Sequence, residues 1–309
     1  MRILIHAPEA RRWQEVLTRE LRPALPGVDI VTTQEAGECP ADILVVWKPP
    51  ASLLACQDAS LKAIFNAGAG VDALLSLPGL PNVPIVRLRD AGMGTLMADY
   101  VLYGILHFYR DMDRYRRQQM DHQWQEQSLA DRSAWRVGIV GLGTLGQACA
   151  RRIRAQGFEV QGWSRSAKQV DGIDTHHGDD GLTTLLKTSQ VLVSLLPNTP
   201  ETRGLLNDQR LGQLPEGTVV INAGRGTTLD PDALLTLIEN GHLRGALLDV
   251  FPEEPLPATH PLWQDPRVII TPHIAAPTDV SEGARQFAAD IVALTRGEHL
   301  DTVDPVTGY

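Results

Sequence analysis

The sequence is poor in cysteine and has no long hydrophobic run. Three cysteines occur in 309 residues (Cys39, Cys56 and Cys149), and their spacing is not that of a metal site. So few, and odd in number, they exclude a disulfide framework and favour a reducing compartment, so we expect a cytoplasmic protein. No window approaches the roughly 18 to 20 uncharged apolar residues that span a bilayer. The apolar run within residues 1–8 ends in proline, so we expect no signal peptide.

Positive charge is also in deficit, with 28 Lys and Arg against 37 Asp and Glu, a formal net charge of −9. This balance argues against nucleic acid or an anionic membrane surface as the main partner. It leaves room for a small acidic metabolite, because a local cluster of Arg and backbone N–H groups outweighs a distant average charge. A hydrophobic content of 43% is ordinary for a globular protein, and the length predicts two domains.

Short apolar runs alternate with helical patterns along most of the chain. The expected strands are residues 3–6, 43–47, 63–66, 137–140, 160–163, 191–195, 219–222, 245–249 and 268–271. Runs this short and apolar suit strands that are buried on both faces of a parallel sheet. The sequence therefore predicts an α/β fold built from right-handed βαβ units.

The alternation is interrupted at residues 95–122, where a long helical segment begins apolar and becomes rich in arginine. We expect its basic half to be a solvated face or a subunit contact rather than a nucleic-acid site. We place the first domain at residues 1–104 and 276–309, because the helical pattern of residues 279–296 is followed by no strand and is expected to return to that domain. The second domain is residues 105–275.

Residues 136–146 read RVGIVGLGTLG, a strand followed by the pattern G-x-G-x-x-G. Gly141 permits a tight turn, Gly143 lets the backbone approach a pyrophosphate, and Gly146 lets helix and strand pack closely. The N–H groups at the start of the following helix, including that of Leu145, favour the negative charge of the pyrophosphate. A purely structural glycine-rich turn is the alternative, but the strand and helix on either side favour a dinucleotide site.

The residues after the next strand indicate which dinucleotide binds. An NAD site normally places Asp or Glu there to bond the ribose 2′-OH, whereas this chain has Ser164, Arg165 and Ser166, with Lys168 beyond. A carboxylate would repel a 2′-phosphate, and arginine and hydroxyl groups can bind one. We therefore expect NADPH (NADP) as the preferred cofactor, with NADH as the second one. The alternative is that Arg165 is a surface residue of a site that takes NAD.

Three segments after later strands each contribute an ionisable residue: Arg225 between two glycines, Glu254 before a proline, and His273 after one. In an open α/β sheet, ligands bind at the carboxyl ends of the strands. Reduction of a 2-oxo acid needs a cation that grips the carboxylate and polarises the ketone, which a guanidinium provides. It also needs a proton donor, for which a histidine oriented by a carboxylate is suited.

Each of these residues has a structural alternative. A lone histidine after a strand is often a satisfied structural residue, Glu254 could cap a turn, and Arg225 could pair with a structural carboxylate. Their joint placement after successive strands of one dinucleotide domain favours a catalytic site. Hydride would come from the nicotinamide, so we expect no metal ion.

The chain resembles the D-2-hydroxyacid dehydrogenase family, and within it the glyoxylate/hydroxypyruvate reductase A type. The resemblance covers nearly the whole chain. Its motifs are residues 46–50 (VWKPP), 66–72 (NAGAGVD), 90–94 (DAGMG), 141–146 (GLGTLG), 163–165 (WSR), 196–202 (LPNTPET), 222–226 (NAGRG), 248–257 (LDVFPEEPLP) and 271–276 (TPHIAA).

The resemblance implies two Rossmann-like domains with parallel sheets, a flavodoxin-like substrate-binding (catalytic) domain and a dinucleotide-binding domain, in a homodimer. It implies that Arg225 binds substrate, Glu254 supports the histidine and His273 donates the proton. For the cofactor it implies contacts with Pro197, Thr202, Ala223 and Asp249. For the substrate carboxylate it implies the N–H groups of Ala69 and Gly70, while Asp72 is expected to N-cap the next helix.

Two features of the chain narrow these expectations. The ribose-binding Asp of many family members is absent, which favours an NADPH-preferring reductase of glyoxylate and hydroxypyruvate. Trp47 beside two prolines would form a narrow wall of the substrate site, although it could equally only pack the core. The competing functions are an NAD-dependent dehydrogenase of another 2-hydroxyacid, a formate or phosphonate dehydrogenase, and a nucleotide-sensing protein without catalysis. Formate oxidation needs no proton donor to an alkoxide, so the Glu–His pair argues against it. The filled Arg, Glu and His positions argue against a protein that only senses nucleotide.

Overall fold

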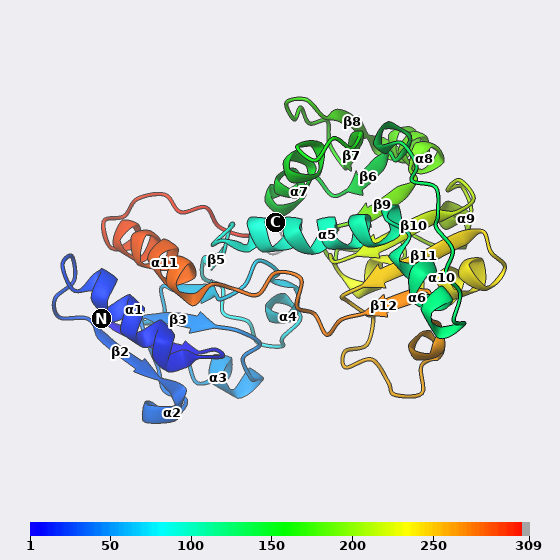
Figure 1. Ribbon diagram of the computed structural model, residues 1–309. Helices are drawn as coiled ribbons and strands as arrows, with labels where there is room; N and C mark the ends of the chain where they lie inside the picture. The colour runs from blue at the N-terminus through cyan, green and yellow to red at the C-terminus, as the bar shows by residue number, and fades with distance from the viewer. Residues whose placement is uncertain (305–309) are drawn as a thin grey trace. The chain divides into compact units, whose positions relative to one another are not determined.

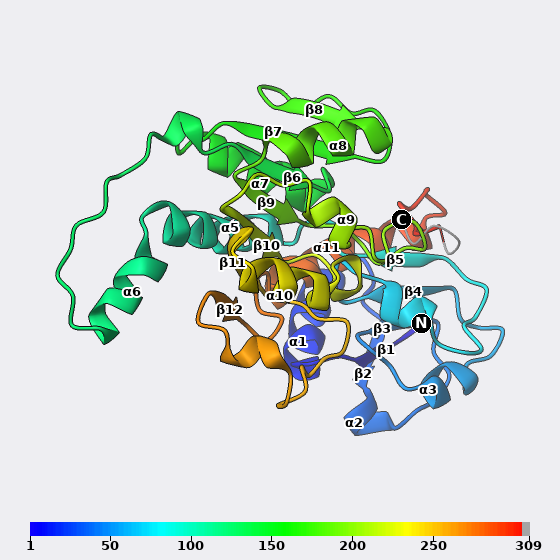
Figure 2. The same cartoon turned by 90° about the vertical axis from the view of Figure 1, so that its right-hand side faces the viewer.

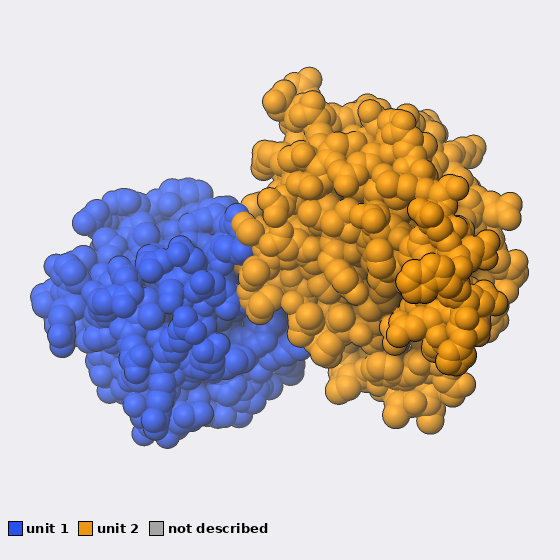
Figure 3. All heavy atoms as spheres, in the orientation of Figure 1, with its two compact units in different colours: residues 1–92, 278–309 blue, residues 93–277 orange. Residues whose placement is uncertain are grey.

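The structure is a computed structural model that describes residues 1–304. The chain forms two compact units, which Figure 3 shows in different colours. Unit 1 combines Met1–Gly92 with Thr278–Tyr309, and unit 2 is Met93–Pro277. None of the helices in residues 1–304 is both long and apolar enough to cross a bilayer.

Unit 1 contains a five-stranded parallel sheet with the strand order β2-β1-β3-β4-β5. This is the flavodoxin-like order that the resemblance implied. The strands are β1 (Arg2–His6), β2 (Asp29–Thr32), β3 (Ile43–Val46), β4 (Ala63–Asn66) and β5 (Ile85–Arg87), and the helices are α1 (Ala10–Leu21), α2 (Thr33–Ala36), α3 (Ala51–Ala55), α4 (Asp72–Leu75) and α11 (Val280–Thr295). Every residue of β3 and β4 is buried, as the apolar runs predicted.

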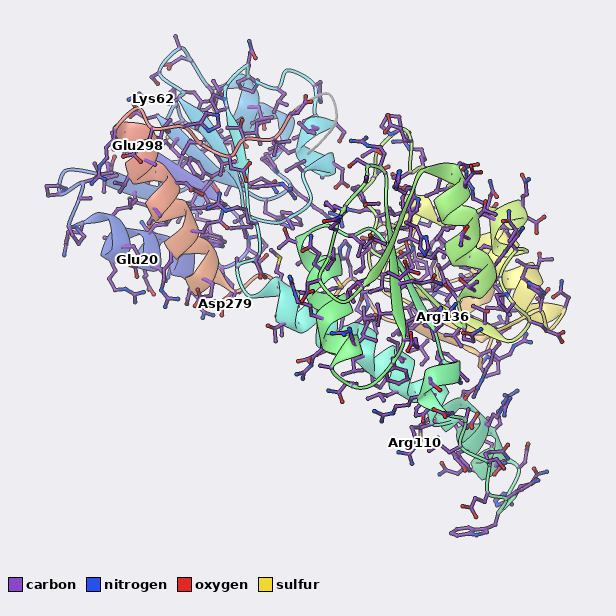
Figure 4. The ribbon with its side chains drawn as sticks, turned by 90° about the horizontal axis from the view of Figure 1, so that it is seen from above. Glu20, Lys62, Arg110, Arg136, Asp279 and Glu298 are labelled. Atoms are coloured by element: carbon purple, nitrogen blue, oxygen red, sulfur yellow. The ribbon has the colours of Figure 1, made fainter. Side chains whose placement is uncertain are left out.

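Helix α11 returns to the N-terminal part of the chain, as its helical pattern predicted. It lies beside α1, and Figure 4 labels Glu20 on α1 and Asp279, the N-cap of α11. Trp13 stacks on Phe287 across this contact, with ring centroids 5.5 Å apart. The packing of these two aromatic side chains makes unit 1 discontinuous in sequence.

Unit 2 contains a seven-stranded parallel sheet with the order β12-β11-β10-β9-β6-β7-β8. The strands are β6 (Val137–Val140), β7 (Val160–Ser164), β8 (Asp174–His177), β9 (Val191–Ser194), β10 (Thr218–Asn222), β11 (Leu243–Leu248) and β12 (Val268–Ile270), and the α-helices are α5 (Met93–Tyr109), α6 (Met112–Met120), α7 (Thr144–Arg154), α8 (Gly178–Thr188), α9 (Asp208–Leu211) and α10 (Pro231–Glu239). Helices cover both faces of this doubly wound sheet (Figures 1 and 2). The order reverses between β6 and β9, and ligands bind at such a switch point.

The strands that the sequence analysis missed are β2, β5 and β8, which lie at sheet edges. Their residues lack a continuous apolar run: β8 reads DTHH and has no buried residue. An edge strand buries less surface, so it needs fewer of the apolar residues by which strands are recognised in a sequence.

The helical segment predicted for residues 95–122 is two helices, because the chain turns at Arg110, which Figure 4 labels, and Asp111. Asp111 has a φ of 55°. Arg244 holds the turn through bonds of 2.6 Å to Asp111 Oδ1 and Asp113 Oδ1. Helix α5 lies wholly in unit 2, so the boundary falls before Met93 rather than within the helix at residue 104. Buried α5 residues such as Val101 and Ile105 share the core of that sheet, which explains the difference.

Candidate active site

The glycine-rich turn joins β6 to α7 and has the geometry of a phosphate-binding turn. Gly141 has a φ of 110°, which favours glycine. A Cβ on Gly146 would lie 1.9 Å from the Gly141 carbonyl oxygen, so no larger residue fits there. Around Gly143, the N-cap of α7, a Cβ would meet no atom within 4 Å. No side chain caps α7, so the N–H groups of its first turn, which includes Leu145, are available to an anion.

The end of β7 carries the residues expected at the adenosine ribose. Ser164 is buried and donates a hydrogen bond of 2.8 Å to the Ser166 carbonyl, while the Arg165 side chain is 66% exposed and lies 4.0 Å from Glu201. Lys168, which the sequence placed only beyond this group, donates from Nζ to the Leu142 carbonyl at 2.9 Å. Its ammonium therefore reaches the glycine-rich turn. The signal in the sequence was a second cation three residues after Arg165.

The loop after β9 contains the next predicted cofactor residues. The Thr202 hydroxyl donates to the Pro197 carbonyl at 2.5 Å and accepts from the Thr199 N–H at 2.9 Å. These bonds close the 197–202 turn. Ala223, which follows β10, donates from its N–H to the Ser194 carbonyl at 3.2 Å. The predicted groove residues thus stand at the carboxyl ends of the adjacent strands β9 and β10.

Arg225 lies in a tightly bonded turn after β10. Its carbonyl accepts from the Thr228 hydroxyl at 2.7 Å and from the Asn222 side-chain amide at 3.3 Å. A Cβ on Gly226 would lie 1.9 Å from the backbone of Phe251, so the glycine lets the two loops approach. Sequence analysis missed Asn222 and Thr228 as supports of the turn. The signal was a polar side chain three residues to either side of the arginine.

His273 and Glu254 form a pair. His273 Nδ1 lies 2.8 Å from Glu254 Oε2, and the second carboxylate oxygen of Glu254 accepts from the Phe251 N–H at 3.1 Å. The side chains are 41% and 31% exposed. With Nδ1 donating to the carboxylate, Nε2 is the nitrogen that can exchange a proton with a ligand. Glu254, rather than Glu253, is the carboxylate paired with the histidine.

Asp249, at the end of β11, is 1% exposed, and its carboxylate contacts the loop that carries His273. One oxygen accepts from Thr271 Oγ1 at 2.6 Å and from the Ile274 N–H at 2.8 Å. The other accepts from the Ala275 N–H at 2.8 Å. These contacts give Asp249 a structural task that the sequence did not indicate. Its predicted contact with the nicotinamide stays a prediction.

In unit 1, the Trp47 ring lies over Gly68, where a Cβ would be 2.1 Å from a ring atom. The Asn66 amide donates to the carbonyls of Gly68 and Gly70, at 2.9 Å each. In a trans peptide the N–H points away from the preceding carbonyl, so the Ala69 N–H is directed away from Asn66. Asp72 is the first residue of α4 and Val71 its N-cap, so the expectation that Asp72 is the N-cap was wrong.

Comparison with known proteins agrees with this geometry. The sequence profile of the D-isomer specific 2-hydroxyacid dehydrogenase NAD binding domain matches residues 102–275. A glyoxylate/hydroxypyruvate reductase A from Serratia proteamaculans (strain 568) is 41% identical over 318 residues, which cover all of both chains.

Two solved structures are similar over nearly their full length. A D-isomer specific 2-hydroxyacid dehydrogenase from Xanthobacter autotrophicus Py2, in complex with NADPH and MES, is 37% identical with a TM-score of 0.93, covering 99% of each chain. An NADPH-dependent glyoxylate/hydroxypyruvate reductase from Sinorhizobium meliloti, in complex with NADP and sulfate, is 35% identical with a TM-score of 0.90, covering 100% of this chain and 99% of that one. The resemblance found in the sequence is confirmed, and the chain belongs to the D-isomer specific 2-hydroxyacid dehydrogenase family.

Proposed function

We propose that the protein is an NADPH-preferring reductase of small 2-oxo acids, converting glyoxylate to glycolate and hydroxypyruvate to glycerate. The observation that carries the proposal is the His273–Glu254 pair, 2.8 Å apart, in the same unit as Arg225 and the glycine-rich turn. The Serratia relative is named for these two substrates, and the Sinorhizobium relative is described as NADPH-dependent.

Each side chain of the site has a task in this reaction. The Arg225 guanidinium binds the substrate carboxylate and draws electron density from the carbonyl oxygen that is reduced. NADPH, when bound, would supply the hydride that adds to the carbonyl carbon. His273 gives the proton from Nε2 to the carbonyl oxygen, so the carbonyl group becomes an alcohol. Glu254 holds the ring in place by its bond to Nδ1.

For the cofactor, we propose that the first turn of α7 binds the pyrophosphate and that Ser164, Arg165 and Ser166 bind the 2′-phosphate. Lys168 is a further cation for this group, since its ammonium already bonds the glycine-rich turn. The 66% exposed Arg165 is accessible to a ligand, and its ion pair with Glu201 is long. We also propose that Pro197, Thr202, Ala223 and Asp249 contact the cofactor.

For unit 1, we propose that Trp47 and the N–H groups of Ala69 and Gly70 bind the substrate. The support is that Asn66 holds the carbonyls of this loop on one side, which directs the Ala69 N–H to the other, as in an anion-binding nest. A tryptophan wall favours a two- or three-carbon acid over a branched one.

Initial-rate assays with a panel of 2-oxo acids and both reduced cofactors test the proposed function. We expect turnover of glyoxylate and hydroxypyruvate with NADPH to exceed that of branched 2-oxo acids, and NADPH to be preferred to NADH. No turnover of any short 2-oxo acid with either cofactor would refute the proposal.

Replacing Arg165 with alanine tests the cofactor assignment. We expect Arg165→Ala to raise the KM for NADPH by about tenfold or more, the effect of one charged hydrogen bond, and to change the KM for NADH less than about twofold. Arg151→Ala, an exposed arginine in the last turn of α7, is the matched control and should change neither value. Equal effects of Arg165→Ala on both cofactors would contradict a role at the 2′-phosphate.

We further propose that the protein is a homodimer and works in the cytoplasm, where its free cysteines stay reduced. Figure 2 shows that α6 and the segment after it extend away from the rest of unit 2. This arm carries exposed apolar side chains, including Met120 and the fully exposed Trp124, which a subunit contact would cover.

Sedimentation of the full chain should give about twice the 33.8 kDa chain mass. Trp124→Asp should give a monomer, whereas Trp263→Asp, at another exposed tryptophan, should not; a monomeric wild type would refute the dimer.

A further inference from the structure

The loop that carries His273 has little packing of its own. Pro272, His273 and Ile274 are all exposed, and within residues 271–274 none is buried. His273 also has a φ of 56°, a left-handed conformation that non-glycine residues adopt only where their surroundings hold them. The position of the imidazole therefore depends on the hydrogen bonds made by this loop.

Glu254 bonds the ring itself, and the bonds that hold the backbone of the loop converge on Asp249 and Thr271. Asp249 accepts from the N–H groups of Ile274 and Ala275, and its own carbonyl accepts from the His273 N–H at 2.9 Å. The Thr271 hydroxyl lies 2.6 Å from Asp249 Oδ1 and 2.6 Å from the Tyr100 hydroxyl. Tyr100 belongs to α5, so this chain of bonds ties the histidine loop to a helix that is remote in sequence.

The chemistry of the three side chains decides which of them donates each hydrogen bond. A carboxylate only accepts, so Thr271 donates its one proton to Asp249. Thr271 Oγ1 can then only accept, which makes Tyr100 the donor. Burial raises the pKa of the Tyr100 phenol, so the hydroxyl keeps the proton that it must donate.

Helix α5 is placed by close packing rather than by this bond alone. A Cβ on Gly104, one turn after Tyr100, would lie 2.6 Å from Leu247 Cδ2 and 2.9 Å from Ile221 Cδ1. The glycine therefore lets α5 approach β10 and β11 closely (Figure 1). Because the helix is fixed by packing, the Tyr100 hydroxyl has a fixed position. It can therefore hold the exposed loop, which has little packing of its own.

We infer that Tyr100 is a positioning residue for the reaction, which sets the place of His273 through Thr271 and Asp249. The inference rests on the proposed function for its kinetic consequence. Neither tyrosine nor threonine contacts the imidazole, so the effect is indirect. When these hydrogen bonds are weakened, the loop that carries His273 can shift, and proton transfer slows. The glycine-rich turn between β6 and α7 lies elsewhere on the sheet and is unaffected.

Tyr100→Phe removes the hydroxyl and keeps the ring. We expect kcat for glyoxylate reduction to fall by about tenfold, the rate equivalent of one hydrogen bond, with the KM for NADPH changed less than about twofold. Thr271→Val should have a similar effect, and the double variant should be no slower than the slower single one. Tyr103→Phe, on the same helix with an exposed ring, is the matched control and should behave like the wild type.

Measuring Tyr100→Phe both in the wild type and in a His273→Gln variant separates a positioning role from a general effect on stability. In His273→Gln protein, Tyr100→Phe should cause no further loss, because the group it positions is gone; an equal loss in both backgrounds would overturn the inference. The ring ¹⁵N resonances of His273, assigned by their absence in His273→Gln, should move in Tyr100→Phe and not in Tyr103→Phe. If the wild type reduces no 2-oxo acid but these resonances move, the proposed function fails and the positioning stands. If it turns over and neither kcat nor the resonances change, the positioning fails alone.

Discussion

Replacing His273 with alanine should lower kcat for glyoxylate reduction by on the order of 10²-fold or more, the usual contribution of a general acid. The alkoxide that forms on hydride addition then has to take its proton from water. The KM for NADPH should stay close to that of the wild type, because the glycine-rich turn and Arg165 are untouched. Initial rates at saturating cofactor measure both quantities.

Replacing the neighbouring carboxylate, Glu254, tests the same proton transfer with a smaller expected effect. Glu254→Gln keeps the size of the side chain but removes the charge that lies 2.8 Å from His273 Nδ1. We expect a smaller loss of kcat than for His273→Ala, because the proton donor remains but is less well oriented.

Histidine 299 offers the control for this series. His299→Ala removes an exposed imidazole in unit 1, and turnover should not change. Near-normal turnover by His273→Ala would exclude His273 as the proton donor. Another group would then have to donate the proton, and Glu254 and His273 would be only a structural ion pair.

How well the sequence predicted the fold depended on burial. Residues 63–66 and 137–140 were predicted with the bounds that β4 and β6 have, because both strands are completely buried and consist mainly of apolar residues. The edge strand β8 has no apolar run. The break at Arg110–Asp111 was missed because a buried ion pair across more than 100 residues, from Arg244 to Asp111 and Asp113, decides it.

The same distinction applies to the site. Arg225, Glu254 and His273 could be proposed from the sequence because each has a reactive group in a motif after a strand, and their catalytic roles stay predictions. Their supports could not: Tyr100 lies 171 residues from Thr271, and no local pattern joins them. Asp249 was predicted as a cofactor residue, yet its carboxylate bonds the loop after β12. Residues that act by position become visible only when the fold brings their partners together.

The second large effect is expected at Arg225. Arg225→Ala should lower kcat/KM for glyoxylate by about 10³-fold, since two hydrogen bonds to a charged group, at about 1.5–3 kcal/mol each, disappear together. Both kcat and KM should change, because the guanidinium holds the carboxylate in the ground state and polarises the reacting carbonyl in the transition state. Arg225→Lys should recover part of the binding and little of kcat, as an ammonium lacks the planar fork.

The surroundings of Arg225 make this result interpretable. The backbone of the turn is held by Asn222 and Thr228 through the Arg225 carbonyl, which alanine retains, so the loop should keep its shape. Arg136→Ala, at the amino end of β6 and labelled in Figure 4, removes the same charge from unit 2 away from the carboxyl ends of the strands. It should leave kcat/KM unchanged. A rise in KM alone for Arg225→Ala would show that Arg225 binds the carboxylate without polarising the reacting carbonyl. An unchanged kcat/KM would remove Arg225 from the site.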